Sequence, residues 1–167
     1  MLALVSSIDA ARGYAGLAPY PTANTEIRLI ARVLPMMNGY FVRADSPFKN
    51  IADIRGARMV YEYRGSHAQT LLADAVLATG GLTHEDIVPF AAAHVVEGID
   101  MLIDGRVDVA MSALGTAASQ RANVTISGGI RALALGPNAT DDFMREHMSG
   151  SRTSTATPSA GMAGIRE

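Results

Sequence analysis

The order of segments in this chain of 167 residues predicts an α/β fold with a mostly parallel sheet flanked by helices. Short runs of β-forming residues alternate with segments of helical periodicity, and glycine-containing turns separate them. The composition agrees, because 49% of the residues are hydrophobic, 18% are charged, and no apolar run is long enough to span a membrane. A chain of this length is about one ordinary domain and can bury a core.

The first third of the chain is expected to form three strands and a helix. Apolar and β-branched runs between polar stretches predict the strands, and Pro35 with Gly39 separates the second from the third. Ser6 and Ser7 are placed to cap the helix. The expected elements are, in order, strand Leu2–Val5, helix Asp9–Tyr14, strand Ile27–Leu34, strand Tyr40–Arg43 and the helical turn Asn50–Ile54.

The rest of the chain alternates more regularly between strands and helices. Gly80 and Gly81 end one helix in the manner of a glycine C-cap, and Gly105 ends the next. The segment Asp104–Asp108 resembles a pair of catalytic carboxylates but is more typical of a tight turn. The expected elements are strand Arg58–Tyr61, helix Ala68–Thr79, turn Thr83–Asp86, strand Val88–Phe90, helix Val95–Ile103, strand Val107–Met111, helix Gly115–Arg121, strand Arg131–Leu135 and helix Asp141–His147.

The turn after strand Arg58–Tyr61 is the most informative feature for function. Gly65 supplies conformational freedom, Ser66 is placed as the N-cap, and a helix follows at once. Such a turn offers backbone N–H groups, a hydroxyl and the positive end of a helix dipole to an anion. The same residues also fit an ordinary capped helix in a βα unit, and this interpretation stays open.

Ligands of open α/β sheets bind outside the carboxyl ends of the strands. Four loops of this chain are expected at that edge: Ser6–Ser7, Glu62–His67, Ala91–His94 and Ser112–Gly115. Two of them carry a serine beside the start of a helix, which favours a small polar or anionic ligand.

Composition and missing motifs disfavour most other functions. Ser66 and His67 are adjacent but lack the Gly-x-Ser-x-Gly pattern of a hydrolase, and the four histidines lack metal-ligand spacing. There are no cysteines, no phosphate-binding loop and no dinucleotide fingerprint, so no catalytic residue, metal or cofactor is expected. The net charge is −2 and the arginines are scattered, which predicts no nucleic-acid partner.

The order and spacing of several segments resemble the TAXI family of TRAP-transporter substrate-binding proteins. The segments that carry the resemblance are Ile27–Pro35, Phe41–Ser46, Ile51–Gly56, the Gly65–Ser66 turn and Met101–Asp108. Together they cover about residues 2–135. The family has Gly-Pro-Pro-Gly-Ser-Gly at the turn, where this chain has Glu62–His67 and keeps Gly65 and Ser66.

The resemblance implies a type II periplasmic-binding-protein fold, with a small organic acid held between two lobes and delivered to a membrane permease. Family members are extracytoplasmic, whereas no signal peptide is recognisable in this chain. They are roughly twice as long, so the first lobe is expected to be incomplete. The expected division is 1–37 for the remnant of lobe one and the first crossover, 38–127 for lobe two with the ligand cradle, and 128–167 for the second crossover and a shortened return.

By this resemblance we expect a set of ligand-binding residues with distinct roles. Gly65, Ser66 and His67 are expected to contact the ligand, Arg64 to supply charge, and Tyr63 to stack on it or act as a lid. Arg64 could equally be solvated and Tyr63 could pack against a neighbouring loop. Ser6 is a weaker candidate. The complete set is Tyr63, Arg64, Gly65, Ser66, His67, Ser112 and Leu114.

Two other functions are compatible with the same fold. The same fold also serves as an effector-sensing regulatory domain, although no helix-turn-helix segment is present, and as an enzyme scaffold, although no catalytic set is visible. If lobe one is incomplete, uncovered apolar surface should drive self-association. The tail 149–164 has the composition of a flexible segment, while the family resemblance predicts the beginning of a return to lobe one.

Overall fold

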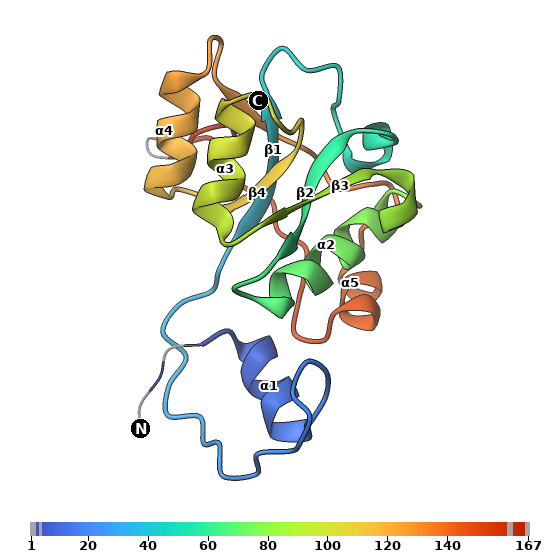
Figure 1. The fold of residues 1–167 in the computed structure, drawn as a ribbon, viewed down its shortest axis with the longest axis vertical. Helices are drawn as coiled ribbons and strands as arrows, with labels where there is room; N and C mark the ends of the chain where they lie inside the picture. Colours follow the sequence, from blue (N-terminus) through green and yellow to red (C-terminus); the bar gives the residue numbers. More distant parts are fainter. Residues whose placement is uncertain (1–2, 4, 160–161, 166–167) are drawn as a thin grey trace.

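The computed structural model describes residues 3, 5–159 and 162–165, and it shows an α/β structure (Figure 1). Strands and helices alternate along most of the chain, as the sequence predicts. The elements are α1 (Ser7–Ala15), β1 (Asn38–Arg43), η1 (Ile51–Ile54), β2 (Arg58–Tyr63), α2 (His67–Thr79), η2 (His84–Asp86), β3 (Val88–Ala92), α3 (Val95–Ile103), β4 (Ala110–Ala113), α4 (Ala117–Thr125), β5 (Ile130–Ala132) and α5 (Asp141–His147).

The strands follow the spatial order β3-β2-β4-β1-β5. β2 and β3 are parallel neighbours, while β1 lies antiparallel between β4 and β5. A parallel bridge between Met59 and Val109 joins the two groups, and the Val60 amide donates to the Val109 carbonyl at 3.0 Å. Four strands therefore point one way and β1 alone opposes them. This confirms the expected mostly parallel sheet.

Helices cover both faces of the strands. Figure 1 shows α3 and α4 on one side and α2 with α5 on the other. Gly98 of α3 lies against Val60 and Tyr63 of β2, where even a Cβ would be only 3.4 Å from either side chain. Large side chains in the resulting core, such as Phe41, Leu77 and others from every layer, are completely buried. Burial on two faces explains the nearly continuous apolar composition of these strands.

The Asp104–Asp108 segment is structural, as its sequence indicates. Gly105 adopts a positive φ of 70°, which a tight turn after α3 requires. The Asp108 carboxylate then accepts hydrogen bonds from the Arg58 side chain, at 2.7 Å from Nη2 and 3.1 Å from Nε, and from the Arg58 backbone N–H at 2.9 Å. This interaction joins the start of β2 to the segment leading into β4.

The expected strand Ile27–Leu34 is wrong. Residues 27–37 belong to no helix or strand, and no strand of the described residues pairs with them. A strand needs a hydrogen-bonded neighbour, and β composition alone does not supply one. The expected strand Leu2–Val5 lies partly outside the described residues, and Val5 itself belongs to no strand.

The tail has no helix or strand between Ser149 and Ser159, which agrees with its composition. Its described end nevertheless contacts the sheet. The Gly164 carbonyl accepts a hydrogen bond from the Ala132 amide at 2.7 Å, and Gly164 is buried against Phe41. The last described residues thus lie along β5, the edge strand of the sheet.

Candidate ligand-binding cavity

The loop between β2 and α2 is held by the end of β3. The amides of Arg64 and Gly65 each donate to a carbonyl of β3 or its following loop, Ala92 and Ala93 respectively, both at 3.0 Å. Gly65 does not have a positive φ, so turn freedom is not its role. It is needed for close approach, because a Cβ there would lie 2.9 Å from the Ala93 carbonyl oxygen.

The start of α2 differs from what the sequence predicts. Ser66 is the N-cap residue, but its side chain makes no cap hydrogen bond. The N-cap side chains of the other α-helices among the described residues all accept one from a helix amide, and these caps are Ser6, His94, Thr116 and Thr140.

The uncapped start of α2 leaves donors available. The Ser66 amide donates to the Tyr63 carbonyl at 3.0 Å, and the Gln69 amide to the Ser66 carbonyl at 3.2 Å. The amides of His67 and Ala68 precede the first intrahelical bond, so the helix gives them no acceptor. Together with the Ser66 hydroxyl they form a small group of donors at the positive end of the α2 dipole.

Ser66 and His67 border a cavity of about 650 Å³ between the α2 start and the N-terminal segment. Two walls can be distinguished: residues 62–70 from the β2–α2 connection, and residues around α1 and the loop after it. The cavity is lined by Val5, Ser6, Asp9, Pro19, Tyr20, Glu62, Tyr63, Arg64, Gly65, Ser66, His67 and Thr70. We call it the α1–α2 cavity.

The α1–α2 cavity carries charges of both signs. Glu62 and Arg64 are exposed, and neither forms an ion pair with another described residue. On the opposite wall, the Asp9 carboxylate accepts from the Ser6 hydroxyl at 2.7 Å and more weakly from the Tyr20 hydroxyl at 3.5 Å. Burial and the nearby Asp9 charge raise the pKa of Tyr20, so this phenol stays a donor at neutral pH.

Five of the expected site residues, Tyr63 to His67, therefore line one cavity, although a stacking or lid role for Tyr63 does not fit. Its side chain is 2% exposed, and its hydroxyl accepts a hydrogen bond from the Met111 amide at 3.2 Å inside the core. Burial raises the pKa of Tyr63 well above its usual value. The ring packs within the hydrophobic core, and this residue borders the cavity without being free to move over it.

Ser112 and Leu114 do not border the α1–α2 cavity. Ser112 is fully buried, and its hydroxyl lies 2.9 Å from that of Thr116, the N-cap of α4. Leu114 is bound through its amide to the Met37 carbonyl at 2.7 Å. Ser112 lies in β4 and Leu114 directly follows it, two strands away from β3. Their polar groups are used in joining β4 to α4 and to the connector before β1.

The α1 wall is less evident from the sequence than the loop before α2. Ser6 is only a weaker candidate there, and no sequence pattern points to Asp9, Pro19 or Tyr20 as site residues. The Ser6-Ser7-Ile8-Asp9 pattern indicates a helix cap, and Ser6 does cap α1 by accepting from the Asp9 amide at 3.0 Å. What the pattern does not reveal is that the start of α1 faces the start of α2.

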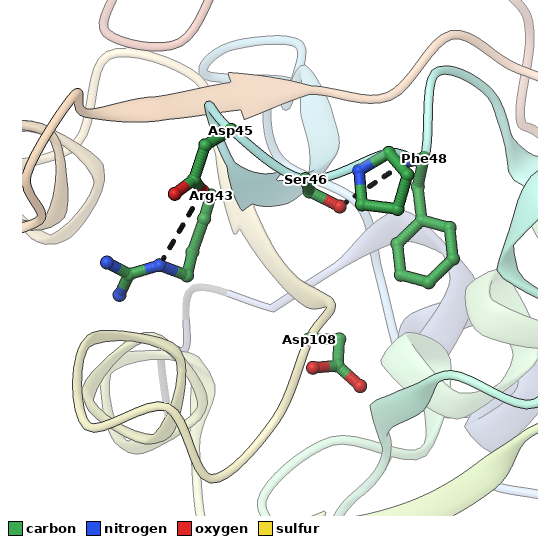
Figure 2. Close-up of a pocket in the computed structure, with 6 residues that line it drawn as sticks. Arg43, Asp45, Ser46, Phe48 and Asp108 are labelled. Atoms are coloured by element: carbon green, nitrogen blue, oxygen red, sulfur yellow. Dashed lines mark hydrogen bonds and ion pairs between the residues drawn. The ribbon is translucent and has the colours of Figure 1, made fainter.

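A second cavity, of about 450 Å³, lies at the loop after β1 (Figure 2). Its lining includes Arg43 and Asp45, which pair at 3.8 Å, and Ser46, whose hydroxyl accepts from the Phe48 amide at 3.3 Å. The Arg131 guanidinium donates to the carbonyls of residues 44, 46 and 48. These polar groups are hydrogen-bonded or ion-paired with one another, so we assign the loop a structural role.

Two further properties bear on function. No group of three or more His, Asp or Glu residues within the described part of the chain is arranged to hold a metal ion. Among the same residues, none of the helices combines the length and apolar character needed to cross a membrane.

The chain belongs to the NMT1-like family, whose model matches residues 1–162. Among solved structures, the chain is similar to the periplasmic aliphatic sulphonate binding protein SsuA from Escherichia coli, at 23% identity and a TM-score of 0.46. It is also similar to the alkanesulfonate-binding protein SsuA from Xanthomonas axonopodis pv. citri bound to MOPS, at 28% identity and a TM-score of 0.45.

A third similar structure is the probable amino-acid ABC transporter extracellular-binding protein ytmK from Bacillus subtilis, at 16% identity and a TM-score of 0.43. These matches cover 59%, 59% and 61% of this chain, and 30%, 32% and 42% of the three structures. The chain thus corresponds to about a third of the sulfonate-binding proteins. A comparison with curated protein sequences found no match.

Proposed function

We propose that this chain is the ligand-binding part of an extracytoplasmic solute receptor, and that it binds a small organic acid in the α1–α2 cavity. The observation that carries the proposal is the uncapped start of α2, where Ser66 and His67 line a cavity of about 650 Å³ and the Ser66 side chain makes no cap hydrogen bond. A cavity of this size suits a small molecule. Helix starts with free amides favour anionic groups.

Each wall has a distinct part in this proposal. The acid group accepts hydrogen bonds from the Ser66 hydroxyl and the His67 and Ala68 amides, with the exposed guanidinium of Arg64 adding positive charge. The remainder of the ligand lies toward the α1 wall, where the Asp9 carboxylate and the Tyr20 hydroxyl offer polar contacts. Gly65 keeps the loop close enough to β3 to hold this arrangement.

The transport role is also proposed. The similar structures include sulfonate-binding proteins and a probable amino-acid transporter binding protein, and sulfonates and amino acids each have an anionic group. Our finer proposal is a receptor of a TAXI-type TRAP transporter, which would present a carboxylate to membrane permease subunits from the extracytoplasmic side. The division into 1–37, 38–127 and 128–167 belongs to the same proposal.

Binding without chemical turnover fits the cavity best. A hydrolase would need a base hydrogen-bonded to Ser66, and no such bond is present among the described residues. The proposal accordingly includes no cofactor and no nucleic-acid partner.

The test is titration calorimetry with a panel of ligands. Succinate, glutamate and methanesulfonate represent carboxylates, amino acids and sulfonates, and a primary amine without an acid group serves as the control. We expect heat from at least one acid and none from the amine. Gly65→Val, checked for folding by circular dichroism, should lose that heat because its side chain meets the Ala93 carbonyl. Equal heats for acids and amine would contradict the proposal.

A further inference from the structure

Residues 28–36, which we call the free edge, belong to no helix or strand and have unpaired backbone. No backbone N–H or C=O of these residues bonds to another described residue, although Ile27 and Met37 on either side are both bonded. Backbone N–H and C=O groups without partners can pair with another strand. Figure 1 shows this segment in the long connection between α1 and β1, away from the sheet.

The apolar side chains of the free edge are exposed to solvent. Its five large apolar residues are exposed: Leu29 85%, Ile30 80%, Val33 70%, Leu34 64% and Met36 65%. Residues of this kind favour strands once a partner is present. Contiguous apolar exposure on this scale is unusual for a surface that stays in water and marks an interaction site.

We propose that the free edge pairs antiparallel with the free edge of a second copy of this chain. A two-fold axis at Ala31 places Leu29 of each copy opposite Val33 of the other. This gives two equivalent apolar cross-strand pairs, one on either side of the axis. The same register sets Ile30 opposite Arg32 and Arg28 opposite Leu34, so no like charges face each other.

The sequence also limits where and how the strands can pair. A register centred on Ile30 would set Arg28 opposite Arg32 of the other copy, which like-charge repulsion disfavours. Pro35 has no N–H and therefore ends the ladder near Leu34. The charge pattern and the proline together favour the Ala31-centred pairing.

The apolar surface available sets the strength of the dimer. At about 100 Å² for each buried apolar side chain, five residues from each copy remove at most about 1,000 Å² from water. Specific interfaces begin at about 1,200 Å² in total. The free edge alone therefore supports a weak dimer whose population rises with protein concentration.

Disulfide trapping tests the register, because the chain has no cysteine of its own. Ala31→Cys should form a covalent dimer under mild oxidation, since directly opposed residues of neighbouring strands are close enough for a disulfide. Val124→Cys is the matched control, because Val124 is 81% exposed on α4, outside the free edge. A mixture of Leu29→Cys and Val33→Cys should give the mixed dimer in excess. Equal trapping of Ala31→Cys and Val124→Cys would overturn the proposal.

Sedimentation velocity tests the association without any cross-link. The unmodified chain should show a dimer that grows with concentration, and both Ala31→Pro and Leu29→Lys should abolish it while Val124→Lys leaves it intact. Circular dichroism confirms that each variant is folded. A strictly monomeric chain would mean that something else covers the free edge, and a dimer unaffected by Ala31→Pro would mean that another surface joins the copies. Either result overturns the proposal.

Discussion

A substitution at Ser66 can test ligand binding with little effect on folding, because the Ser66 hydroxyl makes no hydrogen bond to its own helix. A side chain without such a bond contributes little to folding, so Ser66→Ala should change the free energy of unfolding by less than about 0.5 kcal/mol. Thr140→Ala is the matched control: Thr140 accepts from the Phe143 amide at 3.1 Å, and its loss should cost about 1 kcal/mol. Chemical denaturation of both variants measures the difference. Equal losses would show that Ser66 is a structural cap after all.

Gly136 is the position where an added methyl group should do most harm. A Cβ there would lie 2.3 Å from the Thr79 carbonyl at the end of α2, and the Gly136 amide donates to the buried Thr79 hydroxyl at 2.9 Å. Gly136→Ala should destabilise the protein by roughly 1–3 kcal/mol, as overpacking does. Gly13→Ala in α1 is the control, since its nearest contact is 3.5 Å and alanine favours helix. Thermal unfolding compares them, and a stable Gly136→Ala would refute the close approach.

At the scale of elements, the Arg58–Asp108 pair predicts a pH dependence. Hydrogen bonds from the Arg58 side chain lower the pKa of Asp108 in the folded state. The pair's contribution is therefore fully present above the unfolded pKa of about 4 and is lost as pH falls through the lowered folded value. At pH 7, Asp108→Asn should reduce the free energy of unfolding by about 1 kcal/mol. The difference from the unmodified chain should vanish at pH 2, and a pH-independent difference would contradict the pairing.

The elements also show what sequence patterns can predict. Helices Val95–Ile103 and Asp141–His147 have the predicted bounds, since caps and periodicity are local properties. Segment 27–34 has an equally clear β pattern and forms no strand, because pairing depends on a neighbour that local sequence does not specify. The predicted cap hydrogen bond of Ser66 is absent for a similar reason. The residue type predicts a cap, but the orientation of the hydroxyl depends on the surrounding loop.

At the scale of the whole molecule, the position of α1 determines how well a ligand can be enclosed. The loop Glu62–His67 could be predicted from the strand-turn-helix pattern, but the opposing wall at Ser6, Asp9 and Tyr20 depends on how distant segments pack. The same packing leaves Ser112 and Leu114 outside the cavity. Long-range arrangement of this kind leaves no local periodicity in the sequence.

The extent of enclosure predicts weak binding. The α1 wall rests on a short helix in which Gly13 is the one buried residue, so it gives the ligand little rigid cover. A ligand gains affinity when both sides are enclosed and water is excluded, and a partly covered cradle gains less. Calorimetry should therefore give an affinity weaker than micromolar for organic acids. A micromolar or tighter constant would contradict this expectation and would mean that the α1 wall is well ordered.

The most direct test of the binding-site assignment is nuclear magnetic resonance of isotope-labelled protein during titration with succinate. The amide signals of His67 and Ala68 should shift in a saturable way, because these N–H groups are the proposed donors to the acid group. Titration with a simple amine salt at equal ionic strength should leave them in place. Saturable shifts that appear instead around Arg43–Phe48, with His67 and Ala68 unchanged, would contradict the assignment of the α1–α2 cavity as the binding site.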